Sequence, residues 1–148
     1  MIRRGSRADA GAIGDVFVRA RDEMSYLPRI PDDVRPKLGG WITERHEVWV
    51  VEERGLVLGF AGLSTGWLDH LYIDPGAQGR GHGSMLLQHA KLLQPRGIRL
   101  WVFQKNAGAR RFYERHDFRL EKMTDGSGNM EREPDALYSW QPESGRAL

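Results

Sequence analysis

Hydrophobic positions along the chain follow two spacings, one typical of helices and one typical of strands. Helical spacing near the N-terminus predicts an amphipathic helix, begun by Ser6 or Asp9, that buries Ile13, Val16, Phe17 and Ala20. Further helices are expected over 34–45, from the mid-80s to about 94, and over 106–116. Short runs rich in Val, Trp, Leu and Ile predict strands at 2–4, 47–53, 56–63, 67–73, 98–103, 118–123 and 136–140.

The predicted elements follow the order β-α-α-β-β-β-α-β-α-β-β. Strands 47–53 and 56–63 are separated by Arg54-Gly55 and should form a hairpin. Strands 67–73 and 98–103 are joined through a helix, and a right-handed crossover makes such strands parallel. We therefore expect a mixed α/β (α+β) fold, with a mostly antiparallel central sheet and one parallel βαβ unit. No repeat or linker divides the sequence, so one domain over 1–148 is expected.

Composition excludes several classes of function and partner. The net charge of +2, with both signs mixed along the chain, gives no reason to expect a nucleic-acid partner. The chain has no cysteine, which excludes disulfides and thiolate catalysis, and we expect no metal site. No apolar run approaches the roughly 18 residues of a membrane helix, and the N-terminus opens no signal peptide. No membrane partner and a cytoplasmic location are therefore expected.

The stretch Gln78-Gly79-Arg80-Gly81-His82-Gly83-Ser84 lies between a predicted strand and a predicted helix. Glycines let backbone N–H groups approach an anion, and the helix N-terminus adds partial positive charge. The loop therefore predicts a phosphate site. A Walker loop is excluded because no Gly-Lys-Ser/Thr follows. A dinucleotide fingerprint fails because Ser84 stands where its third glycine belongs, and 100–104 lack the ribose-binding acid.

A third phosphate pattern, Arg/Gln-x-x-Gly-x-Gly/Ala, is matched by Gln78, Gly81 and Gly83. A second segment, 106–118, is similar to Asn-x-x-Ala-x-x-Phe-Tyr-Glu-x-x-Gly-Phe. Its one departure is Asp117 in place of glycine, at an expected left-handed helix end that Asp tolerates well. With both motifs in this order, the chain resembles the GNAT superfamily of N-acetyltransferases.

The resemblance implies acetyl-CoA as co-substrate. Backbone N–H groups from Gly79 to Ser84 would hold its pyrophosphate, helped by the side chain of Gln78 or Arg80. The strand before the loop would bulge and splay from its neighbour, so that its main chain pairs with the pantetheine arm and an N–H polarises the thioester carbonyl. The implied cofactor-binding residues are Leu71, Tyr72, Ile73, Gln78, Gly79, Arg80, Gly81, His82, Gly83, Ser84 and Asn106, the last also a helix cap.

The resemblance also suggests catalytic residues. Tyr113 matches the position of the acid that protonates the leaving thiolate, although its helical spacing with Ala109 and Phe112 also suits a core residue. The base is either Asp69, where several family members carry one, or His70, whose ordinary pKa suits the task better. Strand alternation places the two on opposite faces, so only one can face the slot.

The acceptor is left open by the sequence. The resemblance places specificity in 24–31 and 124–135, where Asp125, Glu131, Glu133 and Asp135 would attract a cationic amine or form a solvated loop. A small-molecule amine is the expected acceptor, a protein N-terminus stays open, and homodimers are common in the family. The alternative function is a non-catalytic acyl-CoA-binding sensor, and a nucleotide-dependent oxidoreductase is a more distant one.

Overall fold

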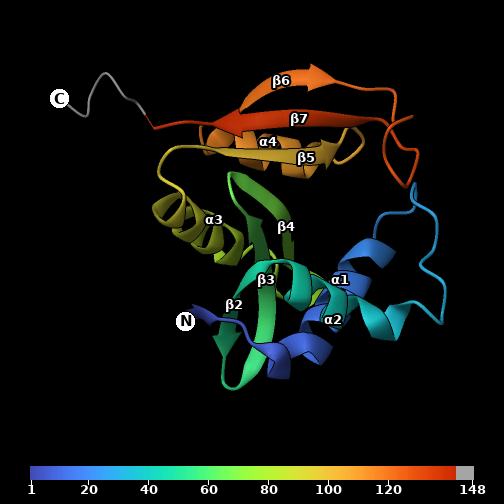
Figure 1. Ribbon diagram of the computed structural model, residues 1–148, viewed down its shortest axis with the longest axis vertical. Helices are drawn as coiled ribbons and strands as arrows, with labels where there is room; N and C mark the ends of the chain where they lie inside the picture. Colours follow the sequence, from blue (N-terminus) through green and yellow to red (C-terminus); the bar gives the residue numbers. More distant parts are fainter. Residues whose placement is uncertain (143–148) are drawn as a thin grey trace.

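A computed structural model describes residues 1–142 (Figure 1). Its strands form one sheet in the order β1-β2-β3-β4-β5-β7-β6. The strands are β1 (Ile2–Arg4), β2 (Glu47–Glu53), β3 (Leu56–Ser64), β4 (Trp67–Ile73), β5 (Ile98–Phe103), β6 (Arg119–Met123) and β7 (Asp135–Trp140). The helices are α1 (Ala10–Asp22), α2 (Leu38–Arg45), α3 (His82–Leu93) and α4 (Ala107–Arg115).

The predicted fold class is confirmed. Within the described sheet, β4 and β5 are the one parallel pair and every other pair is antiparallel. The predicted helix over 34–45 is shorter than expected, because a 3-10 turn that contains Pro36 occupies Arg35–Lys37 and α2 begins only at Leu38. One domain over 1–148 stays a prediction, and residues 143–148 lie outside the described part of the chain.

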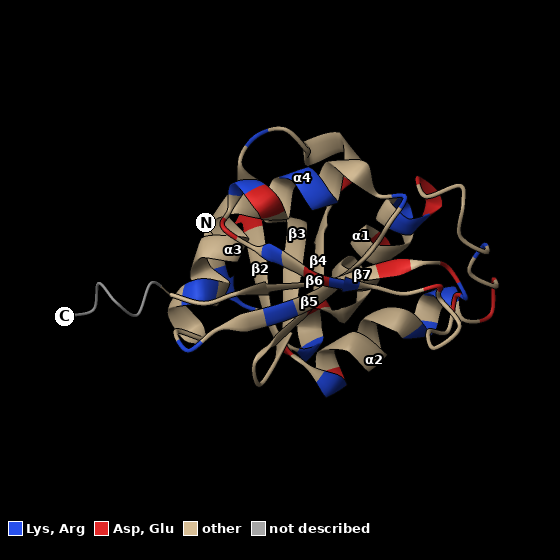
Figure 2. Cartoon of the chain, turned by 90° about the horizontal axis from the view of Figure 1, so that it is seen from above, with Lys and Arg blue, Asp and Glu red and all other residues tan. Residues whose placement is uncertain are grey.

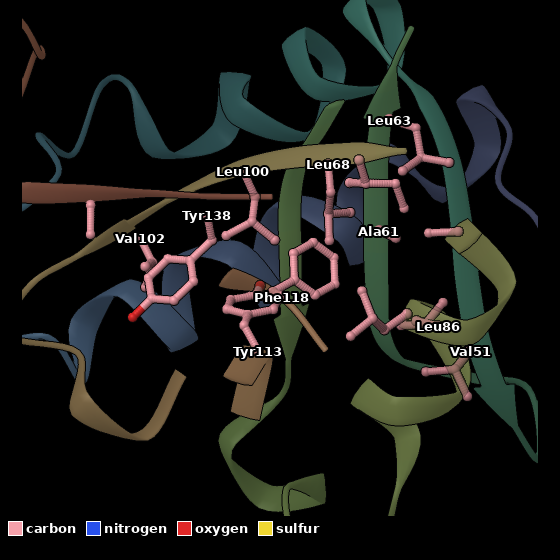
Figure 3. Packing of buried hydrophobic residues seen from close by; sticks show 14 residues of the cluster. Val51, Ala61, Leu63, Leu68, Leu86, Leu100, Val102, Tyr113, Phe118 and Tyr138 are labelled. Carbon is pink, nitrogen blue, oxygen red and sulfur yellow. The ribbon is translucent and has the colours of Figure 1, made fainter. Parts of the chain in front are cut away.

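Alternating side chains of the sheet build two cores, one on each face. On β2, Val50 belongs to the core under α1 and α2, whereas Val51 belongs to the core under α3 and α4. Figure 3 shows the second core, where side chains from β3, β4, β5, β7 and both helices meet. Tyr138 and Leu100 at its centre are at most 1% exposed, so this core fixes α3 and α4 against the sheet.

Helices α1 and α2 approach each other closely at two glycines. A Cβ atom added to Gly39 would overlap the carbonyl oxygen of Ala10 and lie 3.0 Å from the backbone nitrogen of Gly14. The glycine that weakens α2 as an isolated helix is therefore required by its packing.

Two local predictions are confirmed by backbone angles. Arg54 and Gly55 both have positive φ, 52° and 79°, as expected in a two-residue hairpin turn of type I′. Asp117 has φ of 70° and ends α4 in the left-handed conformation.

Charge and hydropathy of the described residues add two observations. Figure 2 shows basic and acidic segments side by side along α4 and the connecting loops. No helix within residues 1–142 is long and apolar enough to cross a membrane.

Candidate active site

The parallel strands β4 and β5 diverge soon after they begin. Their one recorded pair is Trp67 with Arg99, where the Arg99 N–H donates to the carbonyl oxygen of Gly66 at 2.9 Å. Figure 1 shows that the two strands then run in clearly different directions. The divergence opens a slot of about 1000 Å³, lined by β4, the glycine-rich loop, β5, α4 and the segment after α1. This is the splay that the family resemblance implies.

A β-bulge in β4 places Asp69 at this slot. In the pairing with β3, Gly62 lies opposite His70 and Leu63 lies opposite Leu68, so Asp69 is an extra residue without a partner. Bulges redirect side chains next to active sites. Asp69 lines the slot, and its Oδ2 accepts a hydrogen bond from the Ser64 hydroxyl at 2.5 Å.

His70 packs under α1 and does not line the slot. Its ring packs against Phe17 at 5.8 Å and Tyr72 at 6.2 Å between centroids. Burial, with a smaller contribution from His46, lowers the pKa of His70 to about 4. Of the two candidate bases, the structure therefore brings Asp69 and not His70 to the slot.

The glycine-rich loop ends in an open helix N-terminus. Gly81 caps α3 with φ of 85°, a left-handed conformation that favours glycine, and no side chain caps the helix there. The first backbone N–H groups of a helix have no intrahelical partner, and here they belong to His82, Gly83 and Ser84, which line the slot. Gly79 has φ of 81° and also lines it. This geometry suits a diphosphate.

The side chains of the loop differ in their direction. Gln78 lines the slot, and its amide donates to the carbonyl oxygen of Ile73 at 3.1 Å. Arg80 instead donates to the carbonyl oxygen of Gly76 at 3.2 Å and does not line the slot. Of the two side chains expected to reach a phosphate, Gln78 is the one at the slot.

One histidine belongs to the loop and another contacts it. His82 is 7% exposed, and neither ring nitrogen has a hydrogen-bond partner among residues 1–142. His116, which the sequence did not indicate, has its Nε2 3.1 Å from the hydroxyl of Ser84. Its position falls at an unspecified site of the second motif, so no sequence signal marked it.

Tyr113 is both a core residue and a residue of the slot. It is 8% exposed, packs edge-on against Phe118 at 5.6 Å between centroids (both labelled in Figure 3), and also lines the slot. Burial raises its pKa well above the ordinary value of 10, so its hydroxyl keeps its proton at neutral pH.

The remaining predicted cofactor residues also border the slot. The Asn106 side chain accepts a hydrogen bond from the Ala109 N–H at 3.1 Å, which confirms it as the cap of α4. Leu71, Tyr72 and Ile73 line the slot along β4.

At its far end the slot adjoins a second cavity of about 500 Å³. Both share Trp101, Val102 and Phe103, and loop 124–135 lines the second cavity. Arg21, which the sequence did not indicate, joins this loop to β4: it donates to Glu131 at 3.0 Å and to the Tyr72 hydroxyl at 3.3 Å.

The four carboxylates of loop 124–135 are all engaged within the chain. Glu131 pairs with Arg21, and Glu133 lies 3.5 Å from the ammonium of Lys105. Asp125 accepts from the Ser127 N–H at 2.9 Å, and Asp135 accepts from Asn129 at 3.0 Å. Of the four, Glu131 and Asp135 line the second cavity. The loop is thus a folded wall of the site.

Comparison with known proteins identifies the family. A model described as an acetyltransferase (GNAT) domain matches residues 44–120. The peptidyl-lysine N-acetyltransferase YiaC of Escherichia coli K12 is 30% identical over 81% of this chain and 84% of its own length. The peptidyl-lysine N-acetyltransferase YjaB of the same organism is 36% identical over 80% of this chain and 82% of its own.

Solved structures agree with this result. The apo form of E. coli YjaB superposes with a TM-score of 0.75 at 25% identity, covering 95% of this chain and 96% of that one. A structure of yncA from Salmonella typhimurium with acetyl-CoA shares the fold, with a TM-score of 0.71 at 20% identity and 95% and 92% coverage. The chain therefore belongs to the GNAT family and is an acetyl-CoA-dependent N-acetyltransferase.

Proposed function

We propose that this protein transfers an acetyl group from acetyl-CoA directly to a primary amine in the slot between β4 and β5. The observation that carries the proposal is the slot itself. One opening brings together a helix N-terminus, an unpaired length of β4, the hydroxyl-bearing Tyr113 and the carboxylate of Asp69. These are the groups that transfer from a thioester to an amine requires.

Each group has one task. Backbone N–H groups of His82, Gly83 and Ser84 bind the diphosphate, and the open side of β4 holds the pantetheine arm. An N–H near Leu71 polarises the thioester carbonyl. Asp69 takes a proton from the amine, directly or through water, because an alkylammonium with a pKa near 10.4 cannot attack. Tyr113 gives a proton to the leaving thiolate.

The acceptor is a primary amine. YiaC and YjaB are named peptidyl-lysine N-acetyltransferases, which adds a lysine of a protein to the small amines and protein N-termini considered from the sequence. Because the chain has no cysteine, the transfer proceeds without a cysteinyl acetyl-enzyme.

Thermal unfolding with CoA, acetyl-CoA, NAD and ATP tests whether the protein binds the co-substrate. A ligand at a hundred times its Kd adds about 2.7 kcal/mol to stability, and we expect that gain with the CoA ligands only. Release of free thiol from acetyl-CoA, with lysine peptides, peptide N-termini and small amines as acceptors, tests whether it transfers the acetyl group. Stabilisation without thiol release would favour the acyl-CoA sensor, and no stabilisation would contradict the proposed cofactor site.

A further inference from the structure

We infer that His46 is a positioning residue for Asp69, and that the two side chains together hold the proton that the amine acceptor loses. The inference rests on the proposed function of Asp69 as the base. His46 stands at the end of α2, directly before β2, and no motif includes it. Its Nε2 lies 3.4 Å from Oδ2 of Asp69.

The other ring nitrogen of His46 fixes the tautomer. Nδ1 lies 3.0 Å from the carbonyl oxygen of Ile42. A carbonyl oxygen can only accept a hydrogen bond, so Nδ1 carries a hydrogen. In the neutral ring, Nε2 therefore carries a lone pair and directs it toward the carboxylate of Asp69.

This arrangement sets two proton acceptors, Nε2 of His46 and Oδ2 of Asp69, against each other. Without a proton between them, a lone pair of Nε2 faces a lone pair of Oδ2. With a proton between them, the same contact becomes a charge-assisted hydrogen bond, and the proton belongs to the pair as a whole. An isolated aspartate at the slot would lack this gain. The carboxylate is held in place for it, because the Ser64 hydroxyl donates to the same Oδ2.

The groups around His46 leave its ring free to share a proton with Asp69. Within residues 1–142, the titratable or charged groups recorded against the His46 ring are Asp69 and His70, both from β4. The His70 ring lies 4.8 Å away between centroids, and its pKa of about 4 keeps it neutral at pH 7. The His46 side chain is 16% exposed, which gives the proton an exit to solvent.

The proton balance is complete. An N–H bond of the ammonium breaks, its electron pair stays on nitrogen, and the proton passes to Asp69, is shared with His46, and later leaves to solvent. The amine lone pair then forms the bond to the thioester carbon. When the carbon–sulfur bond breaks, the thiolate takes a proton from Tyr113, which recovers one from the second N–H of the attacking nitrogen through water.

The test compares His46→Gln with wild type across pH. Glutamine can place an N–H against Asp69, but it cannot take up a proton. We expect kcat/KM for the amine to fall about 10- to 100-fold at pH 7, with the KM for acetyl-CoA and the CoA-dependent thermal shift within twofold of wild type. The deficit should shrink as pH rises toward about 10, where the amine arrives deprotonated.

His89→Gln is the matched control, since His89 packs against Trp49 and does not line the slot. It should keep the wild-type pH profile. Full activity of His46→Gln, or a deficit that is equal at every pH, would show that His46 only supports the structure and would overturn the inference.

Nitrogen-15 NMR of the histidine rings tests proton sharing between His46 and Asp69 without measuring activity. At mildly acidic pH we expect a slowly exchanging Nε2-bound hydrogen on His46 that is lost in Asp69→Asn. If wild type shows this signal but transfers no acetyl group, the proposed function fails and the proton-sharing pair stands. If the signal is missing from wild type, or survives in Asp69→Asn, the inference is wrong.

Discussion

At the residue scale, Tyr113 combines a packing position with the proposed role of catalytic acid. Its ring belongs to the core under α3 and α4, and the residue also lines the slot. Tyr113→Phe keeps the ring and removes the acid. We expect kcat to fall about 100-fold or more, while the KM for acetyl-CoA and the CoA-dependent thermal shift stay unchanged. Steady-state thiol release measures both constants.

Tyr138→Phe is the control for this prediction. Tyr138 is fully buried, and its hydroxyl bonds to Glu114 and Arg110 outside the slot. Its loss should cost about 1 kcal/mol of stability and leave kcat unchanged. Equal kcat in Tyr113→Phe and wild type would remove Tyr113 from the mechanism.

The pKa of His70 predicts how stability depends on pH. Between its ordinary value of 6.5 and its folded value of about 4, the unfolded chain binds a proton at this site and the folded chain does not. Stability from His70 is therefore present above pH 6.5 and is lost as pH falls toward 4. His70→Phe fits the aromatic surroundings and should flatten this part of the curve, with a gain on the order of 1–3 kcal/mol at pH 4.5. Urea unfolding at several pH values measures it, and an unchanged slope would contradict it.

The sequence could predict the positions of some residues of the candidate site but not of others. Tyr113 and Gly81 stand at fixed places in local motifs, so their positions were predictable. His46, at the end of α2, reaches β4, and Arg21 of α1 reaches loop 124–135; both contacts join residues far apart in the sequence, and no local pattern encodes them. The choice between Asp69 and His70 depended on a bulge, which is set by pairing with β3.

At the element scale, the contact of α1 with α2 predicts opposite effects for adjacent glycines. A Cβ on Gly39 meets the backbone of α1, whereas a Cβ on Gly40 meets nothing within 4 Å. Gly39→Ala should therefore lose about 1–3 kcal/mol by overpacking. Gly40→Ala should gain up to about 1 kcal/mol from helix propensity. Denaturant unfolding of the two variants separates the effect of packing from that of helix propensity. Equal changes in stability would contradict the close contact.

Helices and strands were predictable to within a few residues because their periodicity is local. Loop 124–135 was not, since its shape depends on distant partners. Gly126 adopts φ of 85° against the backbone of Glu133, and Asn129 bonds to both Glu133 and Asp135. The sequence indicated a polar loop there, and the structure shows a wall of the second cavity.

At the scale of the whole molecule, β4 is the last strand of one half of the sheet and β5 is the first strand of the other. A ligand in the slot contacts both halves. We expect saturating CoA to slow amide hydrogen exchange in β4 and in β5 together, because opening either strand then requires release of the ligand. NAD serves as the control. Protection confined to the glycine-rich loop would show that the ligand does not enter between the strands.

The divergence of β4 from β5 has a consequence for the protein without its ligand. Beyond Trp67 and Arg99, each strand presents unpaired backbone groups to the opening, in the middle of a sheet rather than at its rim. Such an edge is a template for any extended chain, including a second copy of the same protein. On the proposed function, CoA held along β4 would take the place of such a chain and block this misassembly. The protein should aggregate fastest when acetyl-CoA and CoA are both scarce, which would make its lifetime depend on the supply of its own co-substrate and product.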